Sequence, residues 1–338
     1  MEFVLETDSC NWISELLATL GNRPLNRLVM PASHDAGMYQ AVDCTPSVNA
    51  GRQPLGANAC NSQTQTGTIL DQLEAGCRYF DIRPVLWNGT LYTGHYQINA
   101  PVTVGCNGPT LSQFLAQISQ FMAETSDLVI LKFSHYYNRN TPRAGFSADD
   151  FRNLISRVQQ SIGPHLFTGP AGPAGLAARD MHDFLAGGGC VLTVYDALPQ
   201  ALHAPGVGIY RYADYPDTGD LVVFDRSATE NTVANMATDQ KAKLANQAHH
   251  DGNLFLLSWT LTQNANQISD CAMGKPDPTS ILDLADRANA TLQPTMEQWI
   301  ADGTVTPKTI PNLIYVDANA DFCLQTALYL NHKLEQMF

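Results

Sequence analysis

The stretches MPASHDAG at residues 30–37 and YFDIRP at residues 79–84 decide which fold this chain is expected to adopt. In each stretch an apolar run ends on ionisable side chains, a histidine and an aspartate in the first, an aspartate and an arginine in the second. A buried strand that ends in this way is typical of an α/β barrel, because the barrel carries its reactive groups at the carboxyl ends of its strands. The stretch LYTGH at residues 91–95 adds a second histidine.

The rest of the chain repeats the same rhythm of apolar strands and longer helical stretches. Strands are predicted at residues 27–31, 78–83, 90–94, 127–133, 190–195, 220–225, 253–259 and 311–316. Helices are predicted at residues 11–20, 67–76, 111–124, 147–161, 230–249, 280–301 and 322–335. This alternation predicts an α/β fold with a parallel sheet, and about eight strands predict a TIM-type (β/α)8 barrel.

Length and charge narrow the class of protein. A chain of 338 residues fits one barrel domain with insertions, so a single domain over residues 1–338 is predicted. The net charge of −13 and the lack of clustered Lys and Arg argue against a nucleic-acid partner. The same charge limits membrane contact to a transient one, and we expect a monomer.

Polar residues end most of the predicted strands. On a barrel these ends meet at one rim, which collects His34, Asp35, Asp81, Arg83, His95, Lys132, Asp225, Trp259 and Asp317. Two histidines, carboxylates and an arginine suit phosphodiester chemistry. One imidazole can take a proton, the other can give one, and a guanidinium can hold the phosphate oxygens.

At these motifs the chain resembles the X domain of phosphatidylinositol-specific phospholipase C, the calcium-independent bacterial type. The similar segments are PASHDAG at 31–37, QLEAGCRYFDIR at 72–83 and YTGH at 92–95, and the clearest resemblance covers residues 27–135. The resemblance implies a distorted, incompletely closed TIM-type barrel. It also implies cleavage between phosphate and diacylglycerol by the inositol 2-hydroxyl, with a cyclic phosphate as first product.

The resemblance also implies roles for individual residues. His34 would be the general base with Asp317 beside it, His95 the general acid working with Asp35, and Arg83 the group that neutralises the phosphate. Asp81, Lys132 and Asp225 would line the headgroup pocket. For Trp259 two interpretations stay open, a wall of that pocket or part of the core.

No metal and no cofactor are expected, because Arg83 supplies the positive charge that calcium brings in other members. Two features depart from the bacterial pattern. Residues 187–189 are all glycine where bacterial members carry a basic residue that contacts inositol, and Ser227 stands where they carry an aromatic one.

Three functions therefore stay open. The first is a phosphodiesterase or lyase acting on a phosphatidylinositol-type substrate, the second a related enzyme acting on a non-inositol phospholipid or soluble phosphodiester. The third is a non-catalytic module that binds a phosphorylated headgroup.

The eight cysteines bear on the cellular compartment of the protein, and the loop at residues 41–66 bears on access to the site. Cys44 and Cys60 flank a stretch of that loop rich in Pro, Gly and Asn and are placed to staple it, whereas Cys77 and Cys190 are predicted to be buried free thiols. The loop is interpreted either as a lid over the site or as a surface insertion. The first ten residues show no pattern of a signal peptide, yet the low charge and two glycosylation triplets, at Asn88 and Asn289, favour an extracellular protein, with the cytoplasm as the alternative.

Overall fold

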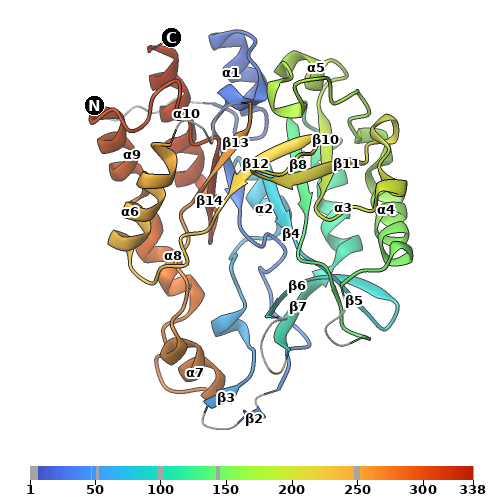
Figure 1. Cartoon of the computed structure of the whole chain (residues 1–338), viewed down its shortest axis with the longest axis vertical. Coiled ribbons are helices and arrows are strands. Elements are labelled where there is room, and N and C mark those ends of the chain that lie inside the picture. Colours follow the sequence, from blue (N-terminus) through green and yellow to red (C-terminus); the bar gives the residue numbers. More distant parts are fainter. Residues whose placement is uncertain are drawn as a thin grey trace.

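A computed structural model describes residues 7–46, 48–50, 53–97, 103–141, 145–246 and 252–337. Eight parallel strands close into a barrel in the spatial order β1-β14-β13-β12-β11-β10-β8-β4 (Figure 1). Their bounds are β1 Met30–Ser33, β4 Tyr79–Ile82, β8 Leu128–Phe133, β10 Cys190–Tyr195, β11 Tyr210–Asp214, β12 Leu221–Asp225, β13 Leu254–Ser258 and β14 Leu313–Val316. The predicted TIM-type barrel is confirmed, but it is closed, so the expectation of an incompletely closed one is wrong.

Helices surround the barrel as an outer layer (Figure 1). They are α1 Trp12–Leu20, α2 Ile69–Glu74, α3 Leu111–Met122, α4 Ala148–Ile162, α5 Met181–Leu185, α6 Val233–Leu244, α7 Ala265–Met273, α8 Ile281–Asn289, α9 Leu292–Ala301 and α10 Asp321–Glu335. Several begin at a side chain that accepts a backbone N–H, such as Thr110 before α3 and Ser147 before α4. Such caps satisfy N–H groups that the first turn of a helix leaves without a partner.

Two strand predictions need correction. Residues 90–94 form a strand, but it belongs to a separate four-stranded sheet in the order β7-β6-β5-β9 rather than to the barrel. Its strands are β5 Pro84–Trp87, β6 Thr90–Gln97, β7 Val104–Thr110 and β9 Tyr137–Asn138. The eighth barrel strand is β11, in a stretch where no strand was predicted. An apolar run shows that a strand forms, but it does not show which sheet the strand joins.

Two helix predictions also need correction. The stretch 280–301 is divided into α8 and α9, which Ala290 and Thr291 separate. The predicted helix 230–249 ends at Leu244 as α6, and residues 247–251 lie outside the described part of the chain.

The core lies in two layers, one inside the barrel and one between barrel and helices. Every residue of β8 and β10 is buried, as expected for parallel strands covered on both faces. The inward layer includes Met30, Ile130 and Leu256, and the outward layer includes Phe133 and Phe255.

Two disulfides lie at the carboxyl end of the barrel. Cys44 bonds Cys106 of β7, and Cys60 bonds Cys271 of α7. The expected staple between Cys44 and Cys60 is therefore wrong, because each cysteine ties the inserted loop to a different neighbour. Cys77 and Cys190 are buried free thiols, as predicted.

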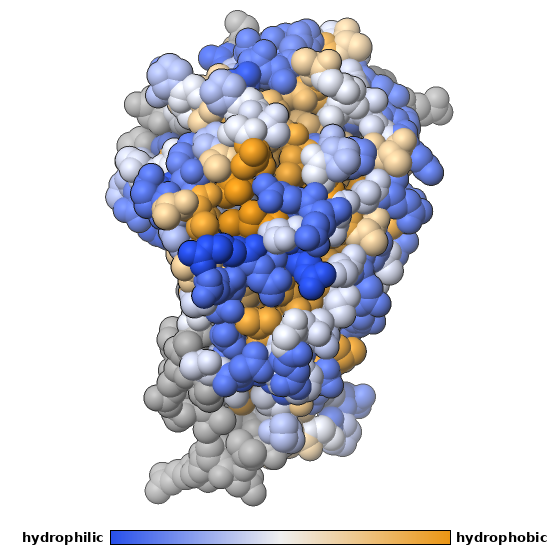
Figure 2. Space-filling view, turned by 90° about the vertical axis from the view of Figure 1, so that its right-hand side faces the viewer, coloured by the Kyte–Doolittle hydropathy of each residue, from blue (hydrophilic) through white to orange (hydrophobic). Residues whose placement is uncertain are grey.

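The face shown in Figure 2 carries both kinds of side chain. Hydrophilic ones cover much of it, and hydrophobic ones gather mainly above the centre of the view. Among the described residues, the large hydrophobic side chains that are well exposed are those of Val42, Val207, Met273 and Met337. None of the helices in the described ranges is both long and apolar enough to cross a membrane.

Candidate active site

The alternation of side chains along each barrel strand brings the polar residues together. In every strand the inward positions form one column, such as Met30 and Ala32 in β1 or Leu313 and Tyr315 in β14. Continued two residues further, these columns end on His34 after β1, Arg83 after β4, Lys132 in β8, Asp196 after β10, Asp214 in β11, Asp225 in β12, Ser258 in β13 and Asp317 after β14. Inward positions recur every second residue, so all of these side chains point to the same mouth of the barrel.

The turn that carries His34 and Asp35 is held tightly. Asp35 has φ of +42°, in the left-handed region. A Cβ on Gly37 would lie 2.4 Å from atoms of Thr93 in β6, so only glycine allows this turn to approach β6 so closely. Two buried glutamines fix the turn from below: Gln65 Nε2 donates to the carbonyl of His34, and Gln72 Nε2 donates to that of Ala36.

The tautomer of His34 follows from its two neighbours. His34 Nδ1 lies 2.6 Å from Asp317 Oδ1, and His34 Nε2 lies 2.7 Å from Arg83 Nη2. A guanidinium only donates hydrogen bonds, so Nε2 must accept and Nδ1 must carry the proton that is donated to Asp317. This arrangement leaves the basic lone pair of His34 on the side of Arg83.

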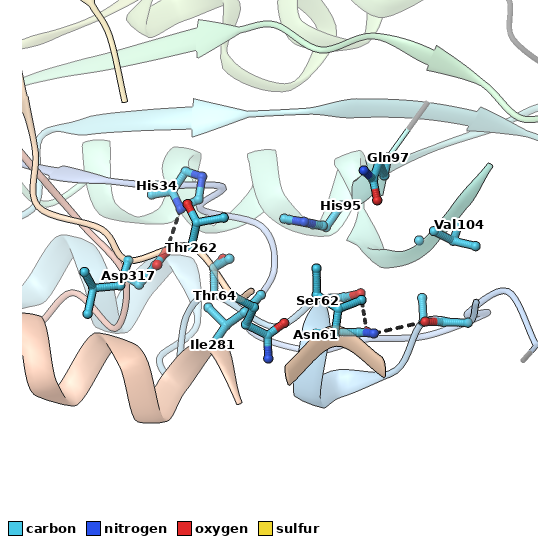
Figure 3. A pocket seen from close by; sticks show the side chains of 16 residues that line it. His34, Asn61, Ser62, Thr64, His95, Gln97, Val104, Thr262, Ile281 and Asp317 are labelled. Atoms are coloured by element: carbon cyan, nitrogen blue, oxygen red, sulfur yellow. Dashed lines mark hydrogen bonds and ion pairs between the residues drawn. The ribbon is translucent and has the colours of Figure 1, made fainter. Parts of the chain in front are cut away.

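The second histidine is paired in the same way. His95 Nδ1 lies 2.7 Å from Asp35 Oδ2, and Asp35 is fully buried. The pairing turns the Nε2 side of His95 away from Asp35 and into a cavity that His34 and Asp317 also line (Figure 3). Asp35 Oδ1 is buried without a hydrogen-bond partner among the described residues.

Arg83 links the two histidine–aspartate pairs. Its Nη1 lies 3.4 Å from Asp35 Oδ2, while its Nε and Nη2 lie 3.0 Å from Asp81 Oδ2. Burial alone would lower the pKa of Arg83, but the carboxylates of Asp35 and Asp81 raise it above its ordinary value. The guanidinium is therefore a permanent positive charge beside His34 and Asp35.

Asp81 lies below the site rather than in its lining, which corrects the prediction that it lines the headgroup pocket. It is fully buried and accepts hydrogen bonds from Tyr315 Oη at 2.6 Å and Ser134 Oγ at 3.0 Å, in addition to Arg83. Burial opposes ionisation, yet the charges of Lys132 and Arg83 hold the pKa of Asp81 well below its usual range. Its oxygens are occupied by the protein, so it positions Arg83.

A polar pocket of about 400 Å³ opens beside His34 and Arg83. Lys132 and Asp225 line it, 2.7 Å apart from Nζ to Oδ2, and Tyr212 Oη also donates to Asp225. Burial works against both charges. The pairing nevertheless raises the pKa of Lys132 and lowers that of Asp225, so the pair is ionised.

The side chain of His135 lines the same pocket, and its backbone has a φ of +52°. Its Nδ1 lies 2.9 Å from Ser134 Oγ, and its side chain is exposed within the pocket mouth. The charge of Arg83, followed by partial burial, lowers its pKa to about 4. His135 is therefore a neutral hydrogen-bonding group at neutral pH.

Two predictions about the pocket need correction, and a third is supported. Trp259 faces the outer core, where its Nε1 donates to the carbonyl of Ala288, because Ser258 and Thr260 take the inward positions. The glycines 187–189 lie at the amino end of β10, and the residue at its carboxyl end is Asp196. Ser227 does line the pocket.

Other pocket residues were not predicted from the sequence, namely Tyr212, Asp214, Thr262 and Tyr315. Strand parity, meaning that every second residue of a strand faces the same side, identifies three of these residues. Tyr212 and Asp214 lie inward in β11, and Tyr315 lies two residues before Asp317. The loop at 41–66 is a wall of the site where it is described, since Gly56 and Thr64 line the cavity with the two histidines.

Several known proteins are similar to this chain in sequence, and others are similar in fold. A PI-PLC X-box domain-containing protein of Dictyostelium discoideum is 25% identical over 235 residues, 67% of this chain and 29% of that protein. PI-PLC X domain-containing protein 2 of Mus musculus is 28% identical over 172 residues, 48% of this chain and 47% of that protein. No family model matches the chain.

Solved structures agree with this similarity. A phosphatidylinositol-specific phospholipase C from Staphylococcus aureus has a TM-score of 0.61 and 17% identity, covering 95% of this chain and 97% of that one. The enzyme from Listeria monocytogenes has a TM-score of 0.57 and 16% identity, covering 97% and 99%. The predicted resemblance to the phosphatidylinositol-specific phospholipase C family is confirmed. The chain spans between about a third and a half of the length of these two curated relatives. It shares the barrel fold with the bacterial enzymes over nearly its whole length.

Proposed function

We propose that this protein is a phosphodiesterase that cleaves a phosphatidylinositol-type phosphodiester by acid–base catalysis and forms a cyclic phosphate. One observation carries the proposal: two histidines are each bonded through Nδ1 to their own aspartate, and Arg83 joins the two pairs by contacting His34 and Asp35. The barrel and the similarity to X-domain proteins support the same class of reaction.

The proposed reaction begins at His34. When the substrate phosphate takes the hydrogen bonds of Arg83, His34 Nε2 is released and accepts the proton of the substrate's 2-hydroxyl. The hydroxyl oxygen bonds to phosphorus, the bond from phosphorus to the leaving alcohol breaks, and protonated His95 gives its Nε2 proton to the leaving oxygen. His34 ends protonated and His95 neutral, which is the state needed for water to open the cyclic product.

Each charged neighbour has a defined part in this reaction. Asp317 stabilises the imidazolium that forms on His34, and Asp35 does the same for His95 before the proton is given away. Arg83 meets the charge that grows on the phosphate oxygens, in a site where its own orientation is fixed by Asp81.

The polar pocket supports a polyol headgroup. Hydroxyl groups donate to carboxylates and accept from ammonium groups, and the pocket offers Asp196, Asp214 and Asp225 together with Lys132. Asp196 is a third carboxylate in the lining of this pocket, and Ser227 holds the position where bacterial members are expected to carry an aromatic residue. These two residues keep open a second candidate, the same reaction on a polyol other than inositol.

Arg83 also supports a reaction without calcium, because its guanidinium already lies between the carboxylates of Asp35 and Asp81. We further propose that the protein acts outside the cytoplasm. Both disulfides lie beside the site, at Cys44–Cys106 and Cys60–Cys271, and disulfides persist in oxidising compartments.

The test is a ³¹P NMR assay on phosphatidylinositol in detergent micelles with excess chelator. Wild type is expected to give a cyclic inositol phosphate, and His34→Ala none. His182→Ala is the matched control, since His182 is exposed on α5 at the opposite end of the barrel. Turnover only after calcium addition would refute the role of Arg83. Binding without turnover under both conditions would favour the non-catalytic module.

A further inference from the structure

A second cavity lies on the other side of His34 from the polar pocket. Its volume is about 170 Å³, and His34, His95 and Asp317 line it together with residues from the loop at 56–64, β7, the segment before α7, and α7 and α8 themselves (Figure 3). Its apolar lining comes from Gly56, Ala57, Val104, Leu261, Ile268 and Ile281.

The polar side chains at this cavity are largely satisfied by the protein itself. Asn61 Nδ2 donates to the carbonyl of Gly56, and Ser62 Oγ donates to Asn61 Oδ1. Thr64 Oγ1 donates to the carbonyl of Asp35. A ligand that enters the cavity therefore meets mostly carbon, apart from the two histidines, Asp317, the amide of Gln97 and the hydroxyl of Thr262.

The two cavities divide the reacting groups between them. Arg83 and Lys132 line only the polar pocket, His95 lines only the apolar cavity, and His34 lines both. In the proposed reaction the acid must touch the oxygen of the leaving alcohol. The leaving group therefore extends from the phosphate toward His95, into the apolar cavity.

We propose that the apolar cavity binds the hydrocarbon part of the leaving alcohol, and that it takes up one slender alkyl or aryl branch of that alcohol at a time. This inference rests on the proposed function and adds the class of leaving group. An engineered protein cavity of about 150 Å³ holds one benzene ring. The cavity here is of that size, so it encloses roughly the first six carbons of one chain and not two chains side by side.

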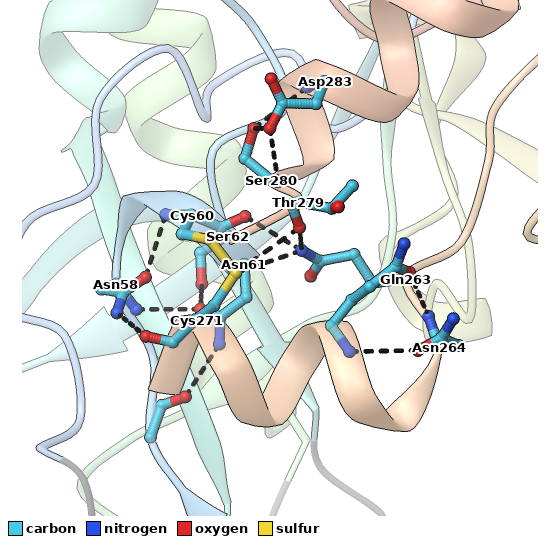
Figure 4. The surroundings of a disulfide bond; sticks show 12 residues. Asn58, Cys60, Asn61, Ser62, Gln263, Asn264, Cys271, Thr279, Ser280 and Asp283 are labelled. Carbon is cyan, nitrogen blue, oxygen red and sulfur yellow. Dashed lines mark hydrogen bonds between the residues drawn. A yellow bond between two sulfur atoms is a disulfide. The ribbon is translucent and has the colours of Figure 1, made fainter. Parts of the chain in front are cut away.

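The walls of the cavity are fixed before a ligand arrives. The Cys60–Cys271 disulfide ties the loop at 56–64 to α7, which carries Ile268 (Figure 4). Gln263 Nε2 donates to the carbonyl of Thr279 at 2.7 Å, and Asn58 Nδ2 donates to that of Cys271 at 2.8 Å. A cavity held in this way loses little conformational freedom on binding, so a monomeric substrate can be bound without a lipid surface.

Alkyl phosphates test the cavity without requiring turnover. The dissociation constants of ethyl, butyl and hexyl phosphate are measured by isothermal titration calorimetry on the intact protein. Each methylene that enters an apolar site tightens binding by about fourfold, so hexyl phosphate is expected to bind at least about tenfold more tightly than ethyl phosphate. Equal affinities for the two would overturn the proposal.

Two variants show where the chain binds. Ile268→Trp fills the cavity from α7, and Val104→Phe fills it from β7, so each should abolish the dependence on chain length. Asn266→Trp is the matched control, because Asn266 is exposed on the same helix and does not line the cavity. A chain-length effect that survives in both filled variants, while they melt as wild type does, would place the binding elsewhere and refute the proposal.

Turnover separates this inference from the proposed function. Soluble inositol phosphodiesters with methyl, butyl and hexyl leaving groups should show kcat/KM rising with chain length. Cleavage at equal rates for all three would overturn the leaving-group cavity and leave the proposed function intact. No cleavage of any of them, with chain-dependent binding of the alkyl phosphates, would refute the proposed function and the assignment of the cavity to a leaving group.

Discussion

Replacing Asp317 with asparagine separates two effects of its carboxylate on His34. Asp317 is almost fully buried, with Oδ1 2.6 Å from His34 Nδ1. Such a carboxylate fixes which ring nitrogen carries the proton and stabilises the imidazolium that forms later. Here Arg83 fixes the tautomer as well, because it donates to Nε2. The carbonyl oxygen of an asparagine can still accept from Nδ1, so the variant keeps the tautomer and loses only the charge.

The size of the loss follows from Coulomb's law. For charge centres roughly 4 Å apart at an effective dielectric constant of about 20, the attraction is about 4 kcal/mol. A loss of that size in the transition state lowers kcat by about 10³-fold, with KM little changed. Asp317→Ala also leaves Nδ1–H without an acceptor, so it is expected to lose roughly tenfold more.

The assay is initial-rate cleavage of phosphatidylinositol in micelles. His34→Ala sets the lower limit of activity, and His182→Ala serves as the surface control. If Asp317→Asn loses less than tenfold, the contact with His34 has no part in the reaction. If it falls to the level of His34→Ala, Arg83 does not preserve the tautomer.

Three further predictions concern the residues around the catalytic pair. Gln65→Leu removes the hydrogen bonds from its Nε2 to the carbonyls of His34 and Val316, so kcat should fall by about 10²-fold and urea denaturation should show a loss of at least about 2 kcal/mol. Lys132→Met leaves Asp225 without its cation and should cost about 3–5 kcal/mol of unfolding free energy at pH 7. The lowered pKa of Asp225 means that this stabilisation is present above pH 3.8 and is lost as the pH falls further, so the deficit should shrink in acid. His135 should titrate near pH 4 in ring ¹⁵N NMR, and a midpoint above 6 would contradict the effect of Arg83 on its pKa.

Strand parity explains which predictions from the sequence were sound. His34, Arg83, Lys132 and Asp225 each lie an even number of residues from inward apolar positions of their strands, so their convergence follows from the sequence alone. The same rule excludes Trp259, which falls between two inward positions. It also identifies Asp196, at the carboxyl end of β10, as a pocket residue in place of the glycines at its amino end.

Other parts of the site depend on contacts that local sequence does not encode. The strand with His95 has the pattern of a barrel strand, yet it pairs with β5 and β7, because the pairing of strands is set by distant partners. The disulfides join residues 62 and 211 positions apart, and flanking positions in a loop carry no information about such partners. The cavity beside His95 is built largely from these long-range contacts.

The site is built from the barrel strands and from inserted loops, and this suggests that the two parts determine the specificity for different ends of the substrate. The barrel strands supply the proposed base His34, Arg83 and the polar pocket, and these side chains are fixed by the parity of the strands. The proposed acid His95 and the apolar cavity come largely from insertions after β1, β4 and β13, which two disulfides hold in place. Substitutions in the insertions can therefore change the leaving group while the barrel keeps its headgroup. Among the residues that the structure describes, His34 and Thr262 are the ones that line both cavities, so changes at those two positions should affect both ends of the substrate.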